Sequence, residues 1–497
     1  MSYWKLLFPG LRCPLVTIGA VRSPWIKSRG LDLIVGCGAW SLPLLLIASP
    51  YTGNLQAWNV AFYALALLFN YPHYMATIFR AYHTKEDFAR YRVWTVYVTA
   101  LLAVALIAAH WSAWLAAWLF TIYVTWSPWH YMGQNFGLSM MFIRRNGIQI
   151  DKKDRDALWV AFVASYVMIF LTFHTNPSND PYVLSLGLPS LLDLFRLPAL
   201  AIFLVLGGWP LSKLVRQAGW RPMIGPITLY VTEFLWFVLP TVLELAMGIH
   251  PPQTRYSAGI LAVMHSAQYL WITSYYARQE SSENSWKPGK YFATLCIGGM
   301  ALFIPGPWLA SYVFHRDFGT SFLVFTALVN IHHFILDGAV WKLRDRRVAS
   351  VLLETKHDES DAARTSWRWF SGLRWRYAGF AAVGLLLLLT AVDQVRYFMS
   401  TRSTESSLRL SVEMNPYDFQ KQNALARILV DTKRYDEAYA HYRKMFARVE
   451  PDAASLMNFG VICRLLHRDE EAAHSFELAL DKSPSYANVI HQLESIQ

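Results

Sequence analysis

Long apolar segments constrain the fold of this chain more than any other feature of its sequence. One of them, residues 318–341, is long enough to cross a lipid bilayer, and its only charged side chain is Asp337. Similar segments recur along the first 400 residues, so we predict an all-α, polytopic membrane bundle of about eleven spans. The predicted spans are residues 31–49, 57–80, 93–110, 112–143, 157–174, 198–215, 223–247, 257–277, 290–312, 318–341 and 377–395.

Two segments depart from a simple straight span. Residues 112–143 are too long for one straight crossing, and we expect Pro128 to kink or break the helix. Residues 182–197 are apolar, but we expect them to lie in the membrane interface.

The composition supports the membrane assignment. Of the 497 residues, 54% are hydrophobic and only 16% are charged, whereas soluble domains carry about 25% charged residues. The formal net charge of +11 comes from basic residues clustered between the apolar segments. Membrane topology accounts for that pattern, so we predict the lipid bilayer, and not nucleic acid, as the partner of these segments.

The distribution of basic residues predicts the orientation of the chain. If the N-terminus is cytoplasmic, the inside segments together hold 29 Lys and Arg, and the outside loops hold three. Such a bias predicts a cytoplasmic N-terminus and an external C-terminus. We therefore expect an inner-membrane protein with a basic cytoplasmic segment at 1–30, a membrane domain at 31–396 and a long cytoplasmic loop at 342–376.

Histidines mark four of the predicted spans, each with polar residues on the same helical face. Asn330, His333 and Asp337 recur at i, i+3 and i+7, so they share one face of a helix. Ionisable groups at membrane depth usually face the bundle interior and serve function, because charging them there costs about 2.5–3.5 kcal/mol. The other three stripes are Asn70/His73/Thr77, His130/Gln134 and His265/Gln268.

These histidines are also predicted to lie at a common depth. All four spans run from outside to inside, and the histidines lie about 10–21 Å from the cytoplasmic end at 1.5 Å per residue. Glu233, on a span of opposite direction, falls at the same depth. Imidazole and carboxylate are the ligands expected for iron, manganese or zinc.

We therefore predict an intramembrane metal site with a surrounding shell of amides that fixes the imidazole tautomers. The predicted ligands are His73, His130, His265, His332, His333, Asp337 and Glu233, and the predicted shell is Asn70, Gln134, Gln268 and Asn330. His333 is preferred over His332, which points about 100° away. A proton or substrate pathway and structural polar packing stay open as alternatives.

Three classes of function fit this pattern, and the sequence identifies no catalytic residue. The first is an oxidoreductase that uses non-haem iron, with zinc as an alternative metal, on a lipophilic substrate. It resembles membrane desaturases, hydroxylases and carotenoid-cleaving oxygenases only in being a histidine-bearing polytopic bundle, since the HxxxH and HxxHH boxes are absent. The second is a haem-binding electron-transfer or haem-modifying protein. The third is a non-enzymatic assembly or translocation factor.

The last 90 or so residues repeat with a period of 34. The matching positions are Ala426 with Gly460, Tyr435–Ala438 with Asp469–Ala472, and Tyr442 with Phe476. This pattern resembles the tetratricopeptide repeat. The resemblance implies stacked helix pairs over 404–497 and a surface that docks a protein or peptide. By the predicted topology this domain is extracytoplasmic, and hence periplasmic in a bacterium.

Overall fold

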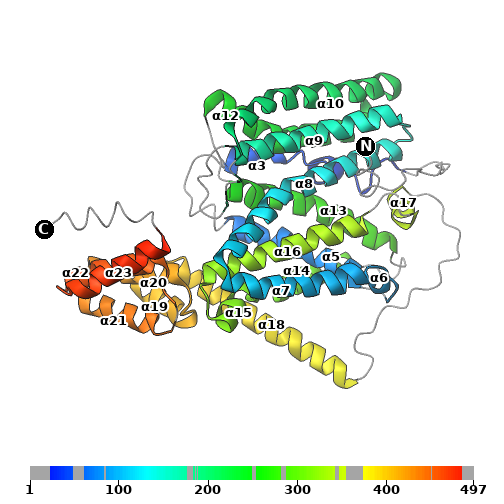
Figure 1. Cartoon of the computed structure of the whole chain (residues 1–497). Helices are drawn as coiled ribbons and strands as arrows, with labels where there is room; N and C mark the ends of the chain where they lie inside the picture. Colours follow the sequence, from blue (N-terminus) through cyan, green and yellow to red (C-terminus); the bar gives the residue numbers. More distant parts are fainter. Residues whose placement is uncertain are drawn as a thin grey trace. The chain divides into compact units, whose positions relative to one another are not determined.

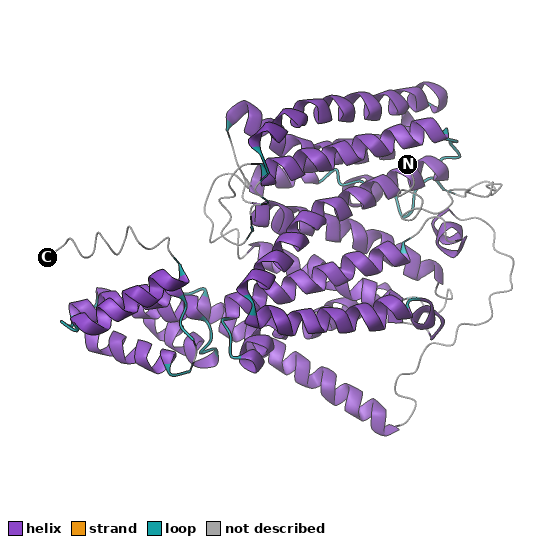
Figure 2. Ribbon diagram, viewed as in Figure 1, coloured by secondary structure: helices purple, strands orange, loops and turns teal. Residues whose placement is uncertain are grey.

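A computed structural model describes most of the chain. The described residues are 23–48, 61–82, 85–175, 183–184, 186, 188–248, 253–280, 287–341, 346–353, 373–448 and 450–483. They form helices and no strand (Figure 2), which confirms the all-helical prediction for this part of the chain. Most of the predicted segment 1–30, most of the loop 342–376 and the last residues of the predicted repeat domain lie outside the described residues.

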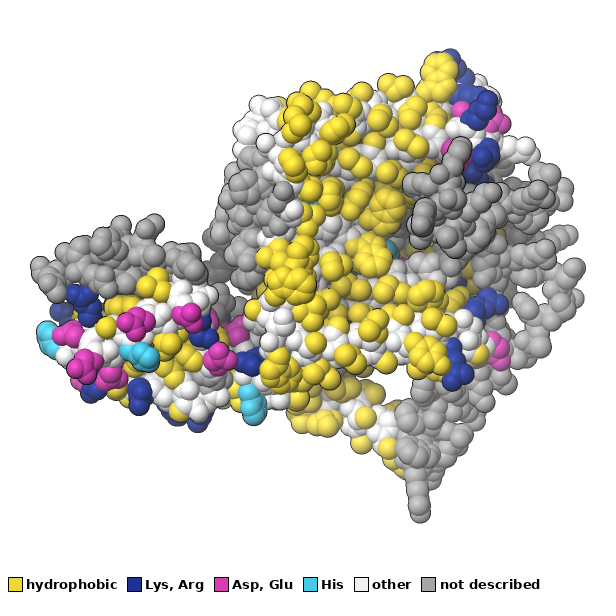
Figure 3. Space-filling model, in the orientation of Figure 1, with side chains coloured by type: hydrophobic (Ala, Val, Ile, Leu, Met, Phe, Trp, Pro, Cys, Tyr) yellow, Lys and Arg dark blue, Asp and Glu magenta, His cyan; other side chains and the backbone are white. Residues whose placement is uncertain are grey.

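Seven helical segments in the described part of the chain are long and apolar enough to cross a membrane, as expected of a multi-pass protein. They are Val93–Trp111, Lys152–His174, Ser190–Ala218, Trp220–Met247, Pro288–Phe314, Phe318–Val340 and Tyr377–Ser400. Hydrophobic side chains cover much of the visible face of the membrane helices (Figure 3). The larger count of eleven spans stays a prediction.

The two segments predicted to depart from a simple straight span are helical where the structure describes them. The helix α8 (Ala113–Arg145) continues through Pro128 as one 33-residue element, so this proline does not break it, and the kink stays a prediction. Part of the segment predicted to lie in the interface, Ser190–Phe195, forms the 3₁₀ helix η4, which leads directly into α10 (Arg196–Ala218).

The chain divides into two compact units. The first comprises Met1–Ala100, Phe120–Gly298 and Asn330–Trp367. Besides η4, α10 and most of α8, its elements include α2 (Arg29–Leu31), η1 (Asp32–Gly36), α3 (Ser41–Ala48), η2 (Ala66–Asn70), α5 (Tyr71–Tyr82), α6 (Lys85–Arg90), η3 (Val93–Val98), α9 (Lys152–His174), α11 (Trp220–Glu233), η5 (Phe234–Val238), α12 (Leu239–Met247), η6 (Thr254–Leu261), α13 (Ala262–Glu280) and α17 (Arg346–Leu353). In the described part of the chain, four helices contribute residues to both units: α8, α7 (Thr99–Trp111), α14 (Pro288–Phe303) and α16 (Phe318–Val340).

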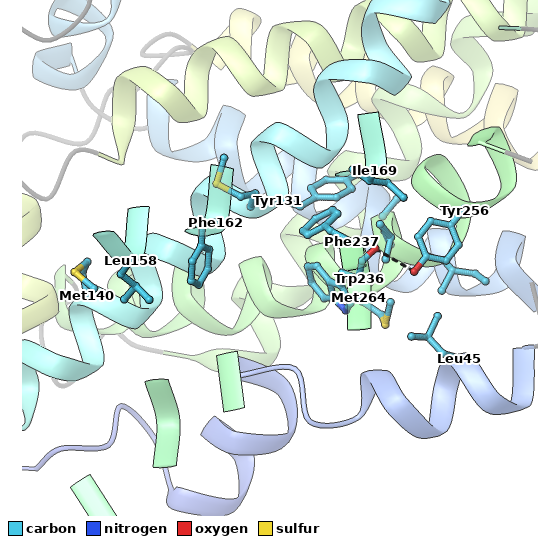
Figure 4. Close-up of a cluster of buried hydrophobic side chains, with 14 of the residues drawn as sticks. Leu45, Tyr131, Met140, Leu158, Phe162, Ile169, Trp236, Phe237, Tyr256 and Met264 are labelled. Atoms are coloured by element: carbon cyan, nitrogen blue, oxygen red, sulfur yellow. Dashed lines mark hydrogen bonds between the residues drawn. The ribbon is translucent and has the colours of Figure 1, made fainter. Parts of the chain in front are cut away.

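The largest core of the first unit packs side chains from α8, α9, η5, η6 and α13 (Figure 4). Phe162, Trp236 and Phe237 are fully buried there. The Tyr256 hydroxyl donates to the backbone oxygens of Leu235 and Trp236 at 3.2 and 3.1 Å. Because a π-turn leaves carbonyls poorly paired, this contact stabilises η5 in the interior.

The second unit comprises Leu101–Leu119, Gly299–Val329 and Arg368–Gln497. It contains α15 (Pro305–Phe314) and α18 (Leu373–Ser400), followed by α19 (Glu405–Met414), α20 (Phe419–Asp431), α21 (Tyr435–Phe446), α22 (Ala453–Leu465) and α23 (Asp469–Lys482). Helices α20 and α22 begin 34 residues apart, as do α21 and α23. The Asp418 and Asp452 carboxylates cap α20 and α22 by accepting from Lys421 N and Ser455 N.

The close crossing of α22 and α23 requires a residue without a side chain at position 460. A Cβ atom there would lie 2.7 Å from Cδ1 of Phe476, a ring that is buried in the same core. We expect Gly460→Val to destabilise this helix pair by about 1–3 kcal/mol through overpacking. Thermal unfolding followed by circular dichroism measures the change. Ala473→Val, at an exposed position of α23, is the matched control and should unfold like the wild type.

The segment between α15 and α16 contacts the turn between α19 and α20. Phe318 N donates to Tyr417 O at 2.8 Å, and Phe419 N donates to Asp317 Oδ1 at 3.3 Å. The Tyr312 hydroxyl donates to Met414 O at 2.6 Å. These contacts fix the first of the C-terminal helices against the end of α15 within this unit.

Acidification is expected to strengthen this contact. Burial raises the pKa of Asp317 to about 6, although hydrogen bonds from the Thr320 and Phe419 backbone oppose the shift. A carboxyl whose pKa is higher in the folded state binds its proton on folding, so its stabilising effect is complete below about pH 4 and is lost as the pH rises through about 6. The melting temperature of the wild type, relative to Asp317→Asn, should therefore rise between about pH 7 and pH 4. A difference that does not change with pH would exclude Asp317 as the responsible group.

Candidate metal centre

Four helices of the first unit bring four histidines together. His73 lies on α5, His130 on α8, His265 on α13 and His333 on α16, and all four helices are labelled in Figure 1. One ligand nitrogen from each ring lies within 4.8 Å of the others. The rings follow one another around a closed circuit, with centroid distances of 4.1 Å (73–333), 5.1 Å (333–130), 4.8 Å (130–265) and 5.0 Å (265–73). The group could hold a metal ion.

The hydrogen bonding of these rings fits a metal. The Nε2 atoms of His73, His130 and His333, and both ring nitrogens of His265, are buried without a hydrogen-bond partner. Buried polar atoms are normally paired, so five unpaired nitrogens at one place require an explanation. Nitrogens bound to one tetrahedral ion at about 2.1 Å lie about 3.4 Å apart, so the four rings would move closer together on binding a metal.

A threonine sets the tautomer of His333. The Thr77 hydroxyl lies 3.0 Å from His333 Nδ1 and donates its hydrogen to Asp337 Oδ1 at 3.0 Å. Because the Thr77 hydrogen already points to Asp337, the Thr77 oxygen accepts the hydrogen bond from Nδ1–H of His333. The lone pair of His333 is then on Nε2, which is the nitrogen that faces the group.

A serine does the same for His73. The Ser266 hydroxyl lies 3.3 Å from His73 Nδ1 and donates to Asn70 Oδ1 at 2.7 Å. His73 therefore carries its hydrogen on Nδ1 and presents the Nε2 lone pair. Two of the four imidazoles are held in the tautomer that binds a metal through Nε2.

Asp337 borders the histidine group. Its Oδ2 atom lies 3.6 Å from Nε2 of His333 and 3.7 Å from Nε2 of His130. Two ligand atoms on one tetrahedral ion are about 3.4 Å apart, so this oxygen is placed almost as a further ligand. The other oxygen, Oδ1, accepts from the Tyr269 hydroxyl at 2.7 Å.

Wide helical turns flank the residues of this region. The π-turn η2 ends at Asn70, three residues before His73, and η6 ends at Leu261, four residues before His265. A third, η5, begins directly after Glu233. A π-turn rotates the residues that follow it around the helix axis, and such turns are frequent at functional sites.

An amide network joins α8 to α13 next to the histidines. Gln134 Nε2 donates to Gln268 Oε1, one turn beyond His130 and His265 respectively. Gln268 Nε2 in turn donates to Asn135 Oδ1 at 3.1 Å and to the backbone oxygen of Gly36 at 2.9 Å. The predicted amides Gln134 and Gln268 thus fix the spacing of the two helices, as outer partners of a metal site do.

Two predicted ligands lie outside the four-histidine group. Glu233 is fully buried, with Oε1 accepting from Ser165 at 2.7 Å and Oε2 accepting from Asn135 at 2.9 Å. His332 Nε2 lies 2.9 Å from the Thr99 hydroxyl. The hydrogen bonds that these two side chains make within the described residues go to partners other than the four histidines, so their ligand role stays a prediction.

The sequence did not single out three residues that shape this region: Ser266, Tyr269 and Asn135. Each follows a recognised residue, since Ser266 and Tyr269 come one and four positions after His265, and Asn135 follows Gln134. The predicted shell residue Asn330 accepts from the Tyr74 hydroxyl at 2.8 Å. A search for every hydroxyl within about one turn of the histidines would have found Ser266 and Tyr269, and Asn135 is the direct neighbour of the predicted Gln134.

Comparison with known proteins gives no assignment, because no family model, no curated protein and no solved structure matches this chain.

Proposed function

We propose that this protein is a membrane oxidoreductase that binds non-haem iron and acts on a lipophilic substrate. The proposed ligands are His73, His130, His265 and His333, with Asp337 beside them. The observation that carries the proposal is the convergence of unpartnered imidazole nitrogens from four helices. Buried ionisable groups at membrane depth are costly and usually functional, which argues against a purely structural role.

The choice of non-haem iron follows from the donor set. Imidazole together with a carboxylate suits iron, and bound ferrous iron supplies oxygen activation. A porphyrin occupies four positions around its iron and leaves only two axial ones. Four histidine nitrogens within 4.8 Å exceed what a haem can use, so the geometry favours a metal held by the protein alone.

The surrounding side chains hold the imidazoles and exclude water. Tyr131 stacks on His265 with centroids 4.4 Å apart, and Phe334 stacks on His130 at 4.5 Å. His73, His265 and His333 are buried. His130 keeps 12% of its side chain exposed, which supports a proposed approach of a bilayer-dissolved substrate from the His130 side.

The proposed setting is the bacterial inner membrane, with the N-terminus in the cytoplasm and residues 404–497 in the periplasm. The excess of basic residues in the segments assigned to the inside supports this orientation. Helix pairs that recur after 34 residues support a tetratricopeptide domain, which would dock a periplasmic protein or peptide.

Metal analysis and a visible spectrum of the purified protein test the proposal. We expect about one iron per chain and no Soret band, because the site binds the ion without a porphyrin. A strong Soret band would favour the haem-binding alternative, and stoichiometric zinc would exclude oxygen chemistry. Protein without any metal would leave an assembly factor with a repeat domain as the better description.

A further inference from the structure

We propose that Tyr269 is a redox-active side chain that loses an electron while its phenolic proton passes to Asp337. The inference rests on the proposed function, because the oxidant is the metal ion of that site in its higher oxidation state. It adds a second redox group, made of protein, to the proposed centre.

Three tyrosines contact the histidine rings, so proximity alone does not select one. The ring centroid of Tyr269 lies 4.6 Å from that of His73, and the ring of Tyr74 lies 5.0 Å from the same histidine. Tyr131 stacks on His265 at 4.4 Å. All three are buried.

The three hydroxyls differ in the group that accepts their hydrogen. Tyr269 donates to the Asp337 carboxylate at 2.7 Å. Tyr74 donates to the amide oxygen of Asn330 at 2.8 Å, and Tyr131 to a backbone oxygen at 3.4 Å. Oxidised phenol is a strong acid, and an isolated charge is costly in an apolar interior, so oxidation there requires a base that takes the proton. Of these acceptors only the carboxylate is such a base.

The Tyr269 oxygen has two further partners, the Thr77 hydroxyl at 2.7 Å and the indole of Trp341, and the indole favours this step. Trp341 Nε1 donates to the Tyr269 oxygen at 2.9 Å, and this hydrogen bond persists when the phenolic hydrogen has left. The Arg80 guanidinium lies over the rings of Trp341 and Tyr276, at 3.9 and 3.7 Å from their centroids. Tyr269 thus lies between the histidines and an aromatic stack toward the end of α5.

The step is balanced. The O–H bond of Tyr269 breaks, an O–H bond forms on Asp337, and one electron goes to the oxidised metal ion. A neutral tyrosyl radical and a neutral carboxyl group result, so no isolated charge is created on these two side chains. Return of the electron and the proton restores the phenol.

Electron paramagnetic resonance of iron-loaded protein, frozen after brief treatment with hydrogen peroxide, tests the inference. We expect a tyrosyl signal in the wild type that narrows when the protein contains ring-deuterated tyrosine. Tyr269→Phe should lose this signal and keep its iron, whereas Tyr74→Phe and Tyr131→Phe should keep both. Trp341→Phe should keep the radical with a shifted g value, because the radical oxygen loses a donor.

The outcomes separate this inference from the proposed function. Wild-type protein without metal would overturn both. Bound iron without a tyrosyl signal, or a signal that persists in Tyr269→Phe, would overturn the role of Tyr269 and leave the proposed function intact. Bound zinc would overturn both proposals and leave only a metal site. If Tyr269→Phe loses iron or unfolds, Trp341→Phe decides, and an unchanged g value there would overturn the assignment.

Discussion

Replacing His333 with alanine is expected to reduce the metal content from about one ion per chain to less than about one tenth. Loss of a partner that only orients a ligand costs about 10–100-fold in affinity, and loss of a ligand should cost at least as much. His333 is the ring nearest to His73 and also faces Asp337, so its removal opens two sides of the group. Elemental analysis of protein purified with limiting iron measures the effect.

The adjacent histidine provides the matched control. His332 directly precedes His333 in the chain. Its Nε2 atom lies 2.9 Å from the Thr99 hydroxyl, away from the four-histidine group. His332→Ala should therefore keep the wild-type metal content. Equal metal loss in both variants would point to a general disturbance of α16, and unchanged metal in His333→Ala would remove it from the ligand set.

The depth of the polar residues could be predicted from the sequence, but their direction around the helix axis could not. Counting from the span ends at a fixed rise per residue places His73, His130, His265 and His333 at one level, and the structure brings these four together. The same counting places Glu233 at that level, yet its oxygens bond Ser165 and Asn135. Direction depends on packing and on π-turns, and neither has a clear sequence signal.

Of the side chains that surround the four histidines, the sequence predicted only the amides that lie in apolar spans. Gln134 and Gln268 are conspicuous for that reason. Ser266 and Tyr269 are not, because hydroxyl-bearing side chains are common in membrane helices and usually bond the backbone of their own helix. Only three-dimensional contacts show that Ser266 sets the tautomer of His73 and that Tyr269 bonds Asp337.

The positions at which helices begin, end or turn could also be predicted from the sequence only in part. Hydropathy predicts one span over 31–49, but the chain turns between η1 and α3, where Gly38 has a φ of 77°. A Cβ at Gly38 would lie 2.7 Å from Cγ2 of Thr232, so that turn also requires glycine for space. In the C-terminal helices the 34-residue period was the stronger signal, because it fixes where α20 to α23 begin.

Replacing Arg396 with methionine is expected to destabilise the second unit by about 3–5 kcal/mol. Arg396 is buried at the end of α18, where its Nε donates to Asp393 Oδ1 at 2.7 Å. Its Nη1 lies 3.6 Å from Asp418 Oδ2, and the guanidinium lies 4.1 Å from the ring centroid of Phe318. Methionine preserves much of the packing but leaves two buried carboxylates without their cation. Limited proteolysis and hydrogen exchange should show earlier opening of α19 and α20.

A double variant distinguishes a charge effect from a packing effect. If the cost comes from unpaired carboxylates, adding Asp393→Leu to Arg396→Met should restore part of the stability, because one uncompensated charge is removed. If the guanidinium mainly packs against Phe318, the second substitution should add a further loss. Partial recovery in hydrogen exchange of α19 and α20 would therefore identify a charge network as the link between α18 and the C-terminal helices. The Asp418 carboxyl is still present in the double variant and still lacks Arg396, although it also caps α20 through Lys421 N, so recovery should be incomplete.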